Sequence, residues 1–234
     1  MLITQKLKTI MICASLLFGL FQKSDLLAQD WPNLAKYESA NEQLMKNKPD
    51  EGRVVFLGNS ITEGWLQANP SFFEGKPYVN RGIGGQTTPQ MVLRFRQDVI
   101  GLKPKIVVIL AGTNDIAENT GPIRLEQIRD NILSMVELAK ANGIVPIVCS
   151  VLPAYEYPWR PGKAPNIKIP KLNALLKAIC EEQQVPFLDY FSVMVDDRNG
   201  LPQSYTTDEV HLTKAGYAVM EKLVEKAITK ALLE

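Results

Sequence analysis

Short apolar runs rich in β-branched residues alternate with amphipathic stretches along this chain, and that alternation most limits what it can fold into. Residues 106–110 form the clearest run, because an unbroken series of aliphatic side chains is typical of a strand buried on both faces. Further runs predict strands at residues 53–57, 78–80, 144–151 and 185–188. Strands that alternate with helices predict a parallel sheet with helices on both faces.

The stretches between these runs carry apolar side chains at helical spacing. Such faces occur in four places: Met91, Val92, Phe95 and Val99; Leu125, Ile128, Ile132, Met135 and Ala139; Leu172, Leu175, Leu176 and Ile179; Val219, Leu223, Ala227 and Ala231. No internal repeat or linker interrupts residues 29–234, which predicts one domain. In parallel sheets of this kind, sites form outside the carboxyl ends of the strands.

The first residues form a separate segment. Lys6 and Lys8 precede an apolar run over residues 10–21, and a small residue, Ala28, follows. This is the pattern of a secretory signal peptide spanning residues 1–28, so we expect export to the periplasm or the exterior. The alternative is an uncleaved N-terminal anchor. After cleavage we expect no integral membrane span.

Charge and composition exclude several classes of partner and cofactor. The formal net charge is +1, which gives no electrostatic footprint for nucleic acid or anionic lipid. The single histidine excludes a zinc site of the cysteine–histidine type. We expect Cys149 and Cys180 to be free buried thiols, because one closes a predicted strand and the other lies on a predicted helix.

A candidate nucleophile follows the first predicted strand. Ser60, in Gly58-Asn59-Ser60, stands where the strand passes into a helix. Backbone N–H groups at a helix N-terminus favour developing negative charge. The alternative is a serine that only caps the helix.

The lone histidine adds weight to the catalytic interpretation. A serine hydroxyl needs a base, and imidazole titrates in the required range. His211 lies just before the last helix, and Asp208 precedes it by three residues, so the carboxylate can orient the ring. The alternative is a surface histidine beside an unrelated aspartate.

Two more segments end at the same predicted edge of the sheet. Residues 82–85 form a glycine-rich turn, and Asn114 follows the third strand in Gly112-Thr113-Asn114-Asp115. Exposed N–H groups and a side-chain amide are the components of an oxyanion hole. A phosphate loop is the rival interpretation of the turn, but the lysine and the glycine spacing of the known phosphate motifs are absent.

Taken in order, these blocks resemble those of the SGNH hydrolases, also called GDSL lipases and acylhydrolases. The resemblance runs from about Arg53 to Gly216 and looks most like the branch that contains platelet-activating-factor acetylhydrolase catalytic subunits and bacterial carbohydrate acetylesterases. It implies a flavodoxin-like three-layer α/β sandwich, a five-stranded parallel sheet of order 2-1-3-4-5, and no cofactor. An α/β-hydrolase elbow fits less well, because it would need glycine where Thr62 stands.

The resemblance also implies roles for individual residues. Ser60 takes the place of the nucleophile, Asp208 and His211 complete the triad, and the oxyanion would be held by Ser60, Gly85 and Asn114. One position departs from the family pattern: the aspartate that usually precedes the serine is Asn59 here.

We therefore expect a serine esterase that works through an acyl-serine intermediate. The absence of a long apolar insertion favours short acyl groups. The alternatives are a lysophospholipase or thioesterase acting on longer chains, and a non-catalytic carbohydrate-binding relative.

An aromatic segment after the fourth strand suggests the substrate. Residues 153–162 contain three aromatic residues among three prolines, which makes a preformed surface. Aromatic faces pack against sugar rings, so we expect an acetylated carbohydrate. The expected substrate-binding residues are Trp65, Tyr155, Tyr157, Trp159 and Arg160. The alternative is that these aromatics only cover the end of the sheet.

Overall fold

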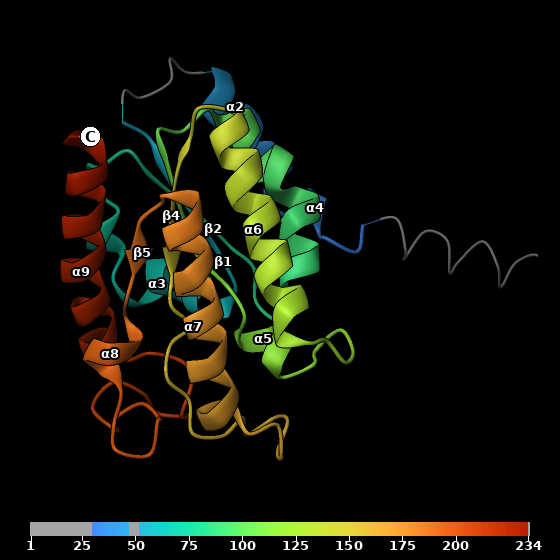
Figure 1. Cartoon of the computed structure of the whole chain (residues 1–234). Coiled ribbons are helices and arrows are strands. Elements are labelled where there is room, and N and C mark those ends of the chain that lie inside the picture. The colour runs from blue at the N-terminus through green and yellow to red at the C-terminus, as the bar shows by residue number, and fades with distance from the viewer. Residues whose placement is uncertain (1–29, 47–51, 234) are drawn as a thin grey trace, which may run out of the picture.

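The computed structural model describes residues 30–46 and 52–233 (Figure 1). Its centre is a five-stranded sheet with the order β2-β1-β3-β4-β5, in which every neighbouring pair is parallel. The strands are β1 (Val54–Gly58), β2 (Tyr78–Gly82), β3 (Ile106–Leu110), β4 (Val145–Cys149) and β5 (Phe187–Leu188). The predicted order and parallel direction are confirmed.

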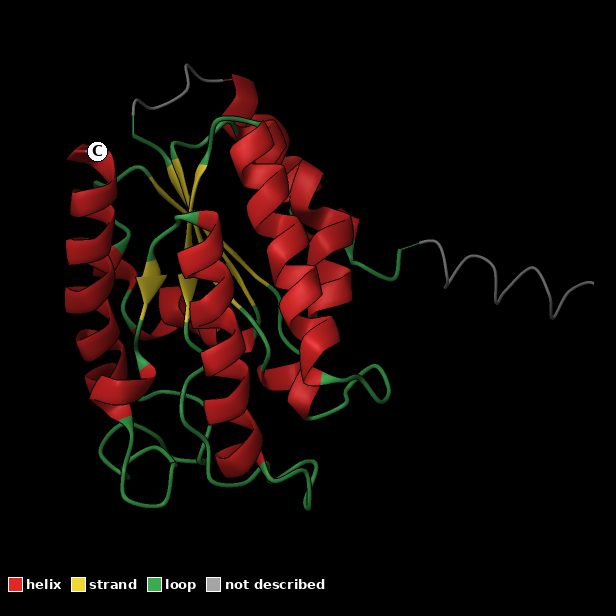
Figure 2. Ribbon diagram, in the orientation of Figure 1, coloured by secondary structure: helices red, strands yellow, loops and turns green. Residues whose placement is uncertain are grey.

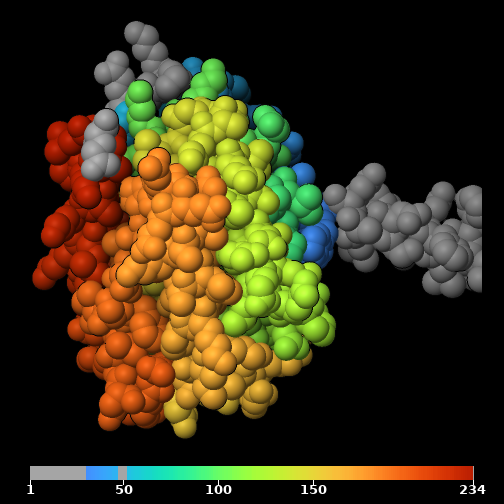
Figure 3. All heavy atoms as spheres, in the orientation of Figure 1, coloured from blue at the N-terminus to red at the C-terminus, as the bar shows by residue number. Residues whose placement is uncertain are grey.

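Helices cover both faces of the sheet (Figure 2). One layer contains α4, α6 and α7, each packed against the next, while α3 and α9 contact each other on the opposite face. The helices are α2 (Glu38–Lys46), α3 (Ser60–Ala68), α4 (Thr88–Asp98), α5 (Thr113–Ile116), α6 (Leu125–Ala141), α7 (Pro165–Gln183), α8 (Phe191–Met194) and α9 (Lys214–Leu233), with short 3-10 turns η1 (Leu34–Lys36), η2 (Pro70–Phe72) and η3 (Ile100–Leu102). In the space-filling view, α6, α7 and the chain after β5 form a continuous surface (Figure 3).

Burial of the strands explains their sequences. Every residue of β1 and of β3 is buried, as expected for strands with a neighbour on each side and helices on each face. β2 lies at the edge, and its first three residues are only half-buried. The sheet therefore buries β1, an interior strand between β2 and β3, directly before the Ser60 segment.

Trp65 belongs to this core, which corrects the expectation that it lines a substrate wall. Its side chain is 1% exposed. The indole ring stacks on Phe72, with centroids 4.9 Å apart, and its Nε1 donates to Glu221 at 3.0 Å. The physical reason is helical geometry: Trp65 lies one turn after buried Ile61, on the face of α3 that packs inward.

α7 begins earlier than its apolar face predicts. Pro165 stands at its start, where a missing N–H costs nothing, but Pro170 lies inside the helix. Pro170 cannot donate to the carbonyl of Asn166, one turn earlier. Asn199 Nδ2 donates to that carbonyl instead, at 3.2 Å. A side chain from the loop before α9 thus satisfies the group that proline leaves open.

Cys149, at the end of β4, and Cys180, in α7, are free buried thiols. Burial raises the pKa of both thiols, that of Cys180 to about 12. Both therefore stay protonated and behave as small apolar side chains.

The expected signal peptide, residues 1–28, lies outside the described residues. Within residues 30–46 and 52–233, no helix has the length and apolar character needed to cross a bilayer.

Candidate active site

Ser60 is the first residue of α3, directly after the carboxyl end of β1. The side chain of Asn59 caps this helix, because its Oδ1 accepts the N–H of Ile61 at 3.1 Å. Asparagine and aspartate share this acceptor oxygen. The departure from the family pattern at Asn59 therefore keeps the cap that sets the start of the helix, without a buried charge.

His211 and Asp208 reach Ser60 from the far end of the chain. His211 Nε2 lies 3.0 Å from Ser60 Oγ, and His211 Nδ1 lies 2.6 Å from Asp208 Oδ2. An ionised carboxylate only accepts hydrogen bonds, so it selects the tautomer with the proton on Nδ1. Nε2 is then left as the acceptor that faces the Ser60 hydroxyl.

Backbone groups hold the Asp208 carboxylate in this orientation. Its Oδ1 accepts the N–H groups of His211 at 2.7 Å and of Val210 at 3.0 Å. Partial burial raises the pKa of Asp208, but the hydrogen bonds from the His211 ring and from the two N–H groups outweigh it and bring that pKa below its usual value. Asp208 is therefore charged at neutral pH.

The glycine turn after β2 lies against Ser60. A side chain at Gly82 would collide with the backbone of Glu63, and a Cβ at Gly84 would lie 3.8 Å from the Cβ of Ser60. Gly85 has φ 75° with open space around it, a conformation that favours glycine. Gly82 can therefore approach α3 this closely only because it has no side chain.

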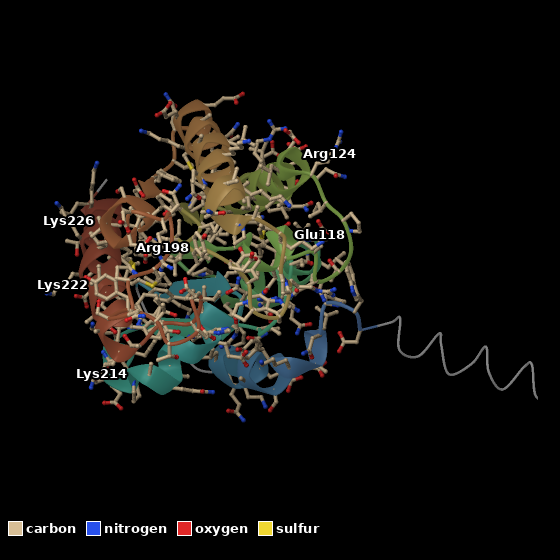
Figure 4. All side chains as sticks on the ribbon, turned by 90° about the horizontal axis from the view of Figure 1, so that it is seen from below. Glu118, Arg124, Arg198, Lys214, Lys222 and Lys226 are labelled. Carbon is tan, nitrogen blue, oxygen red and sulfur yellow. The ribbon has the colours of Figure 1, made fainter. Side chains whose placement is uncertain are left out.

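Asn114, on α5, lies next to the same turn. It is 3% exposed, and its Nδ2 donates to the carbonyl of Gln86 at 3.0 Å. One amide hydrogen is used in this bond, and the other remains available. Ser60, the glycine turn and Asn114 thus gather at the carboxyl edge of the sheet. Figure 4 views the molecule from below, the side toward which the strand arrows of Figure 2 point.

Comparison with known proteins agrees with this arrangement. A family model described as the GDSL-like lipase/acylhydrolase family matches residues 56–219. The chain belongs to the GDSL-like lipase/acylhydrolase family. The predicted family is confirmed, and the protein is an ester hydrolase.

Individual relatives support the assignment of this acylhydrolase. It is 30% identical over 200 residues to the alpha2 subunit of human platelet-activating factor acetylhydrolase IB, with 83% of each chain covered. It is 48% identical to a GDSL-like lipase from Bacteroides thetaiotaomicron, whose crystal structure superposes with a TM-score of 0.83 over 86% of this chain and 98% of that one. An uncharacterized lipoprotein of Bacillus subtilis, YqeF, is 40% identical over 127 residues, which cover 45% of this chain and 52% of that protein.

The aromatic segment of the acylhydrolase divides into exposed and buried residues. Trp159 is 41% exposed, and its ring centroid lies 6.4 Å from that of His211. Tyr155 and Arg160 are also exposed. Tyr157 is fully buried and stacks on Trp159, with centroids 5.0 Å apart, so it supports the rim and does not line it. This corrects the expectation for Tyr157.

A residue that sequence analysis missed ties the ends of two strands together. Arg94, on α4, is fully buried. It donates to the carbonyls of Gly58 and Arg81, both at 2.9 Å, and to Gln86 Oε1 at 2.6 Å. Burial lowers the pKa of Arg94, and its ion pair with Asp98 opposes that change. The sequence signal that could have revealed Arg94 was a charged residue directly before Phe95, on the otherwise apolar face of the predicted helix.

Asp115 has a structural position within the third block. Its carboxylate accepts the N–H of Thr88 at 2.9 Å and the Thr88 hydroxyl at 2.6 Å, which joins α5 to the start of α4. Burial raises the pKa of Asp115 to about 6. Its charge therefore depends on pH in the physiological range.

A second missed group borders the loop of Asp208. The guanidinium of Arg198 lies 4.9 Å from the centre of the Tyr155 ring and pairs with Asp196 at 2.9 Å. It also approaches Glu209 at 3.6 Å. These contacts connect the exposed aromatic rim to the segment that carries Asp208 and His211. Arg198 is labelled in Figure 4.

The described residues contain no group of three histidine, cysteine, aspartate or glutamate side chains placed to hold a metal ion.

Proposed function

We propose that this acylhydrolase removes short acyl groups, chiefly acetyl, from carbohydrate through an acyl-serine intermediate. The observation that carries the proposal is a complete hydrogen-bonded line from Ser60 through His211 to Asp208 that stays open to solvent beside an exposed tryptophan. The His211 side chain is 46% exposed and that of Asp208 44%. A site this open admits an ester on a bulky alcohol.

The geometry supports a two-step reaction. Ser60 Oγ attacks the ester carbonyl while His211 Nε2 takes its proton. The imidazolium that forms is stabilised by the charged Asp208, and it then donates the proton to the leaving alcohol. A water molecule, activated by the same nitrogen, attacks the acyl-serine and releases the acid. The negative charge of each tetrahedral intermediate is held by the N–H groups of Ser60 and Gly85 and by the Asn114 amide.

The exposed rim supports a sugar as the alcohol part. Trp159 presents its ring next to His211, and Tyr155 and Arg160 extend the same segment. Aromatic faces pack against the C–H faces of sugars, and a guanidinium donates hydrogen bonds to hydroxyl groups. The predicted signal peptide and the similarity to a protein named as a lipoprotein support export, where glycans would be met.

Long acyl chains are less well supported. An apolar cavity of about 440 Å³ lies between α2, α3 and β2, lined by residues that include Tyr37, Leu44, Leu66 and Phe73. Its lining contains none of Ser60, Gly85, Asn114 and His211. It therefore offers no direct place for a chain attached to the nucleophile, and we do not favour the lysophospholipase or thioesterase alternative. Membership of an ester hydrolase family likewise disfavours the non-catalytic relative.

A substrate screen tests the proposal. Rates on 4-nitrophenyl acetate, butyrate and octanoate should fall with chain length, and acetylated xylo-oligosaccharides should release acetate. Tyr155→Ala should slow the oligosaccharide reaction while leaving 4-nitrophenyl acetate cleavage unchanged, because only the first substrate carries a sugar. Faster cleavage of octanoate than of acetate, or equal losses on both substrates with Tyr155→Ala, would contradict it.

A further inference from the structure

Four polar groups form a continuous hydrogen-bonded chain from the exposed rim to the candidate oxyanion site. Trp159 Nε1 donates to Asn119 Oδ1 at 3.1 Å. Asn119 Nδ2 donates to Asn114 Oδ1 at 3.0 Å, and Asn114 Nδ2 donates to the Gln86 carbonyl at 3.0 Å. Side-chain amides thus connect three segments: the aromatic loop, α5 with the loop after it, and the end of the glycine turn.

The chemistry of the two ends fixes the direction of every bond in this chain. An indole N–H can only donate, so it requires the oxygen of Asn119 to face Trp159. The Asn119 NH₂ group then faces Asn114 Oδ1, and it also lies 3.3 Å from the carbonyl of Gly85, which can only accept. At the other end, the Gln86 carbonyl requires the NH₂ group of Asn114. Neither amide can turn over without placing two acceptors or two donors against each other.

The loop that carries Asn119 is held to the aromatic segment by a second contact. Glu118 Oε2 and Lys163 Nζ form an ion pair at 2.6 Å, and the Asn119 N–H donates to the Asn114 carbonyl at 3.0 Å. Glu118 is labelled on the site face in Figure 4. The position of Asn119 is therefore fixed from both sides, and its side chain has one orientation in which all its bonds are made.

We propose that Trp159 and Asn119 are positioning residues that hold the Asn114 amide with its second N–H, the one not bonded to the Gln86 carbonyl, toward the oxyanion. This proposal rests on the proposed function, in which the Asn114 amide stabilises the tetrahedral intermediate. If the amide turned over, it would present a carbonyl oxygen to the developing negative charge. Trp159 then affects catalysis even when the substrate carries no sugar. An aromatic ring that only packs against a sugar would have no such effect.

We call the hydrogen-bonded chain Trp159–Asn119–Asn114–Gln86 the relay. Two substitutions distinguish this relay from an aromatic surface that only binds sugar. Trp159→Phe keeps an aromatic ring on Tyr157 but loses the N–H, and Asn119→Ala removes the middle link. On a substrate without sugar, Trp159→Phe should lower kcat by about 3- to 10-fold and Asn119→Ala by about 10-fold or more, with KM unchanged, because misplaced catalytic groups act on the transition state. Trp31→Phe is the matched control, since Trp31 is a second exposed tryptophan, 45% exposed, outside the relay.

A double-mutant cycle gives the decisive test. Rates are measured on the 4-nitrophenyl ester that the wild type cleaves fastest, so a wrong acyl preference leaves the test intact. If Trp159 acts through Asn114, adding Trp159→Phe to Asn114→Ala should change kcat by less than 2-fold. Thermal unfolding confirms that each variant is folded.

The outcomes distinguish the two proposals. Wild-type kcat in Trp159→Phe, or the same fold loss from Trp159→Phe in both backgrounds, would overturn the relay while leaving the esterase mechanism in place. Wild-type kcat in Asn114→Ala would instead remove Asn114 from the oxyanion site and with it the basis of the relay.

Discussion

His211 Nε2 lies 3.0 Å from Ser60 Oγ, although the two residues are 151 positions apart in the chain. Ser60 is placed by the interior strand β1, and His211 by the segment just before α9, a helix that packs against α3. Contact between a hydroxyl and an imidazole nitrogen held by a carboxylate is the geometry of an activated nucleophile. The predictions below test what each group contributes.

Ser60→Ala should abolish esterase activity, with a loss of kcat of about 10⁴-fold or more, because the nucleophile and base act as a unit. The fold should be retained, since Ser60 is not part of the apolar core. Burst and steady-state release of 4-nitrophenol measure the loss, with Ser71→Ala, an exposed serine in η2, as the control. More than a tenth of wild-type activity in Ser60→Ala would exclude Ser60 as nucleophile.

His211 should govern the acid side of the pH–rate profile. A protonated imidazole cannot accept the Ser60 proton, so kcat/KM should decline on the acid side of the profile. The chain has no other histidine to obscure this limb. His211→Ala should lose as much activity as Ser60→Ala. Constant kcat/KM down to pH 4 would show that a different group is the base.

Asp208→Asn should reduce kcat, but less than loss of Ser60 or His211, because the carboxylate orients the ring and does not touch the substrate. The backbone bonds to Oδ1 from His211 and Val210 can persist in the variant, so the loop should stay in place. Asp130→Asn, on α6, is the control. Wild-type turnover in Asp208→Asn would mean that another group orients His211.

Asn114→Ala should lower kcat by about 10²–10³-fold with little change in KM, the pattern expected when a hydrogen bond made only in the transition state is lost. The competing interpretation is that Asn114 only supports the turn through Gln86. In that case the variant would unfold at lower temperature while each folded molecule kept its rate, and the two measurements together decide between them.

Asp115 should make stability depend on pH. Its pKa is about 6 in the folded protein, against an ordinary value of 3.8, so the folded state binds more protons between those pH values. The stability contribution is therefore full below about pH 4 and declines as the pH rises through 6. Relative to Asp115→Asn, the wild type should lose on the order of 2–3 kcal/mol of unfolding free energy from pH 4 to 7, measured by urea titration. Parallel pH curves would show that folding does not raise the pKa of Asp115.

The architecture and the candidate reacting groups could both be predicted from the order of residues in the chain. Uninterrupted aliphatic runs such as residues 106–110 leave no polar face for water, so they indicate buried strands wherever they stand. The glycines of the turn and the residues around Ser60, Asn114 and His211 each follow a strand or precede a helix. Parallel strands bring such positions to one edge without any further information.

The side chains that face that edge, and the groups that they contact, could be found only in the folded protein. Trp65 and Tyr157 looked like rim residues by type, but their directions depend on helix rotation and on loop path, which burial energy settles. The bond from Trp159 to Asn119 joins two loops 40 positions apart, and no periodic pattern records how such loops approach each other. A donor and an acceptor form a hydrogen bond only when the fold brings them within reach. The hydrogen-bonded chain from Trp159 to Gln86 therefore exists only in the folded protein.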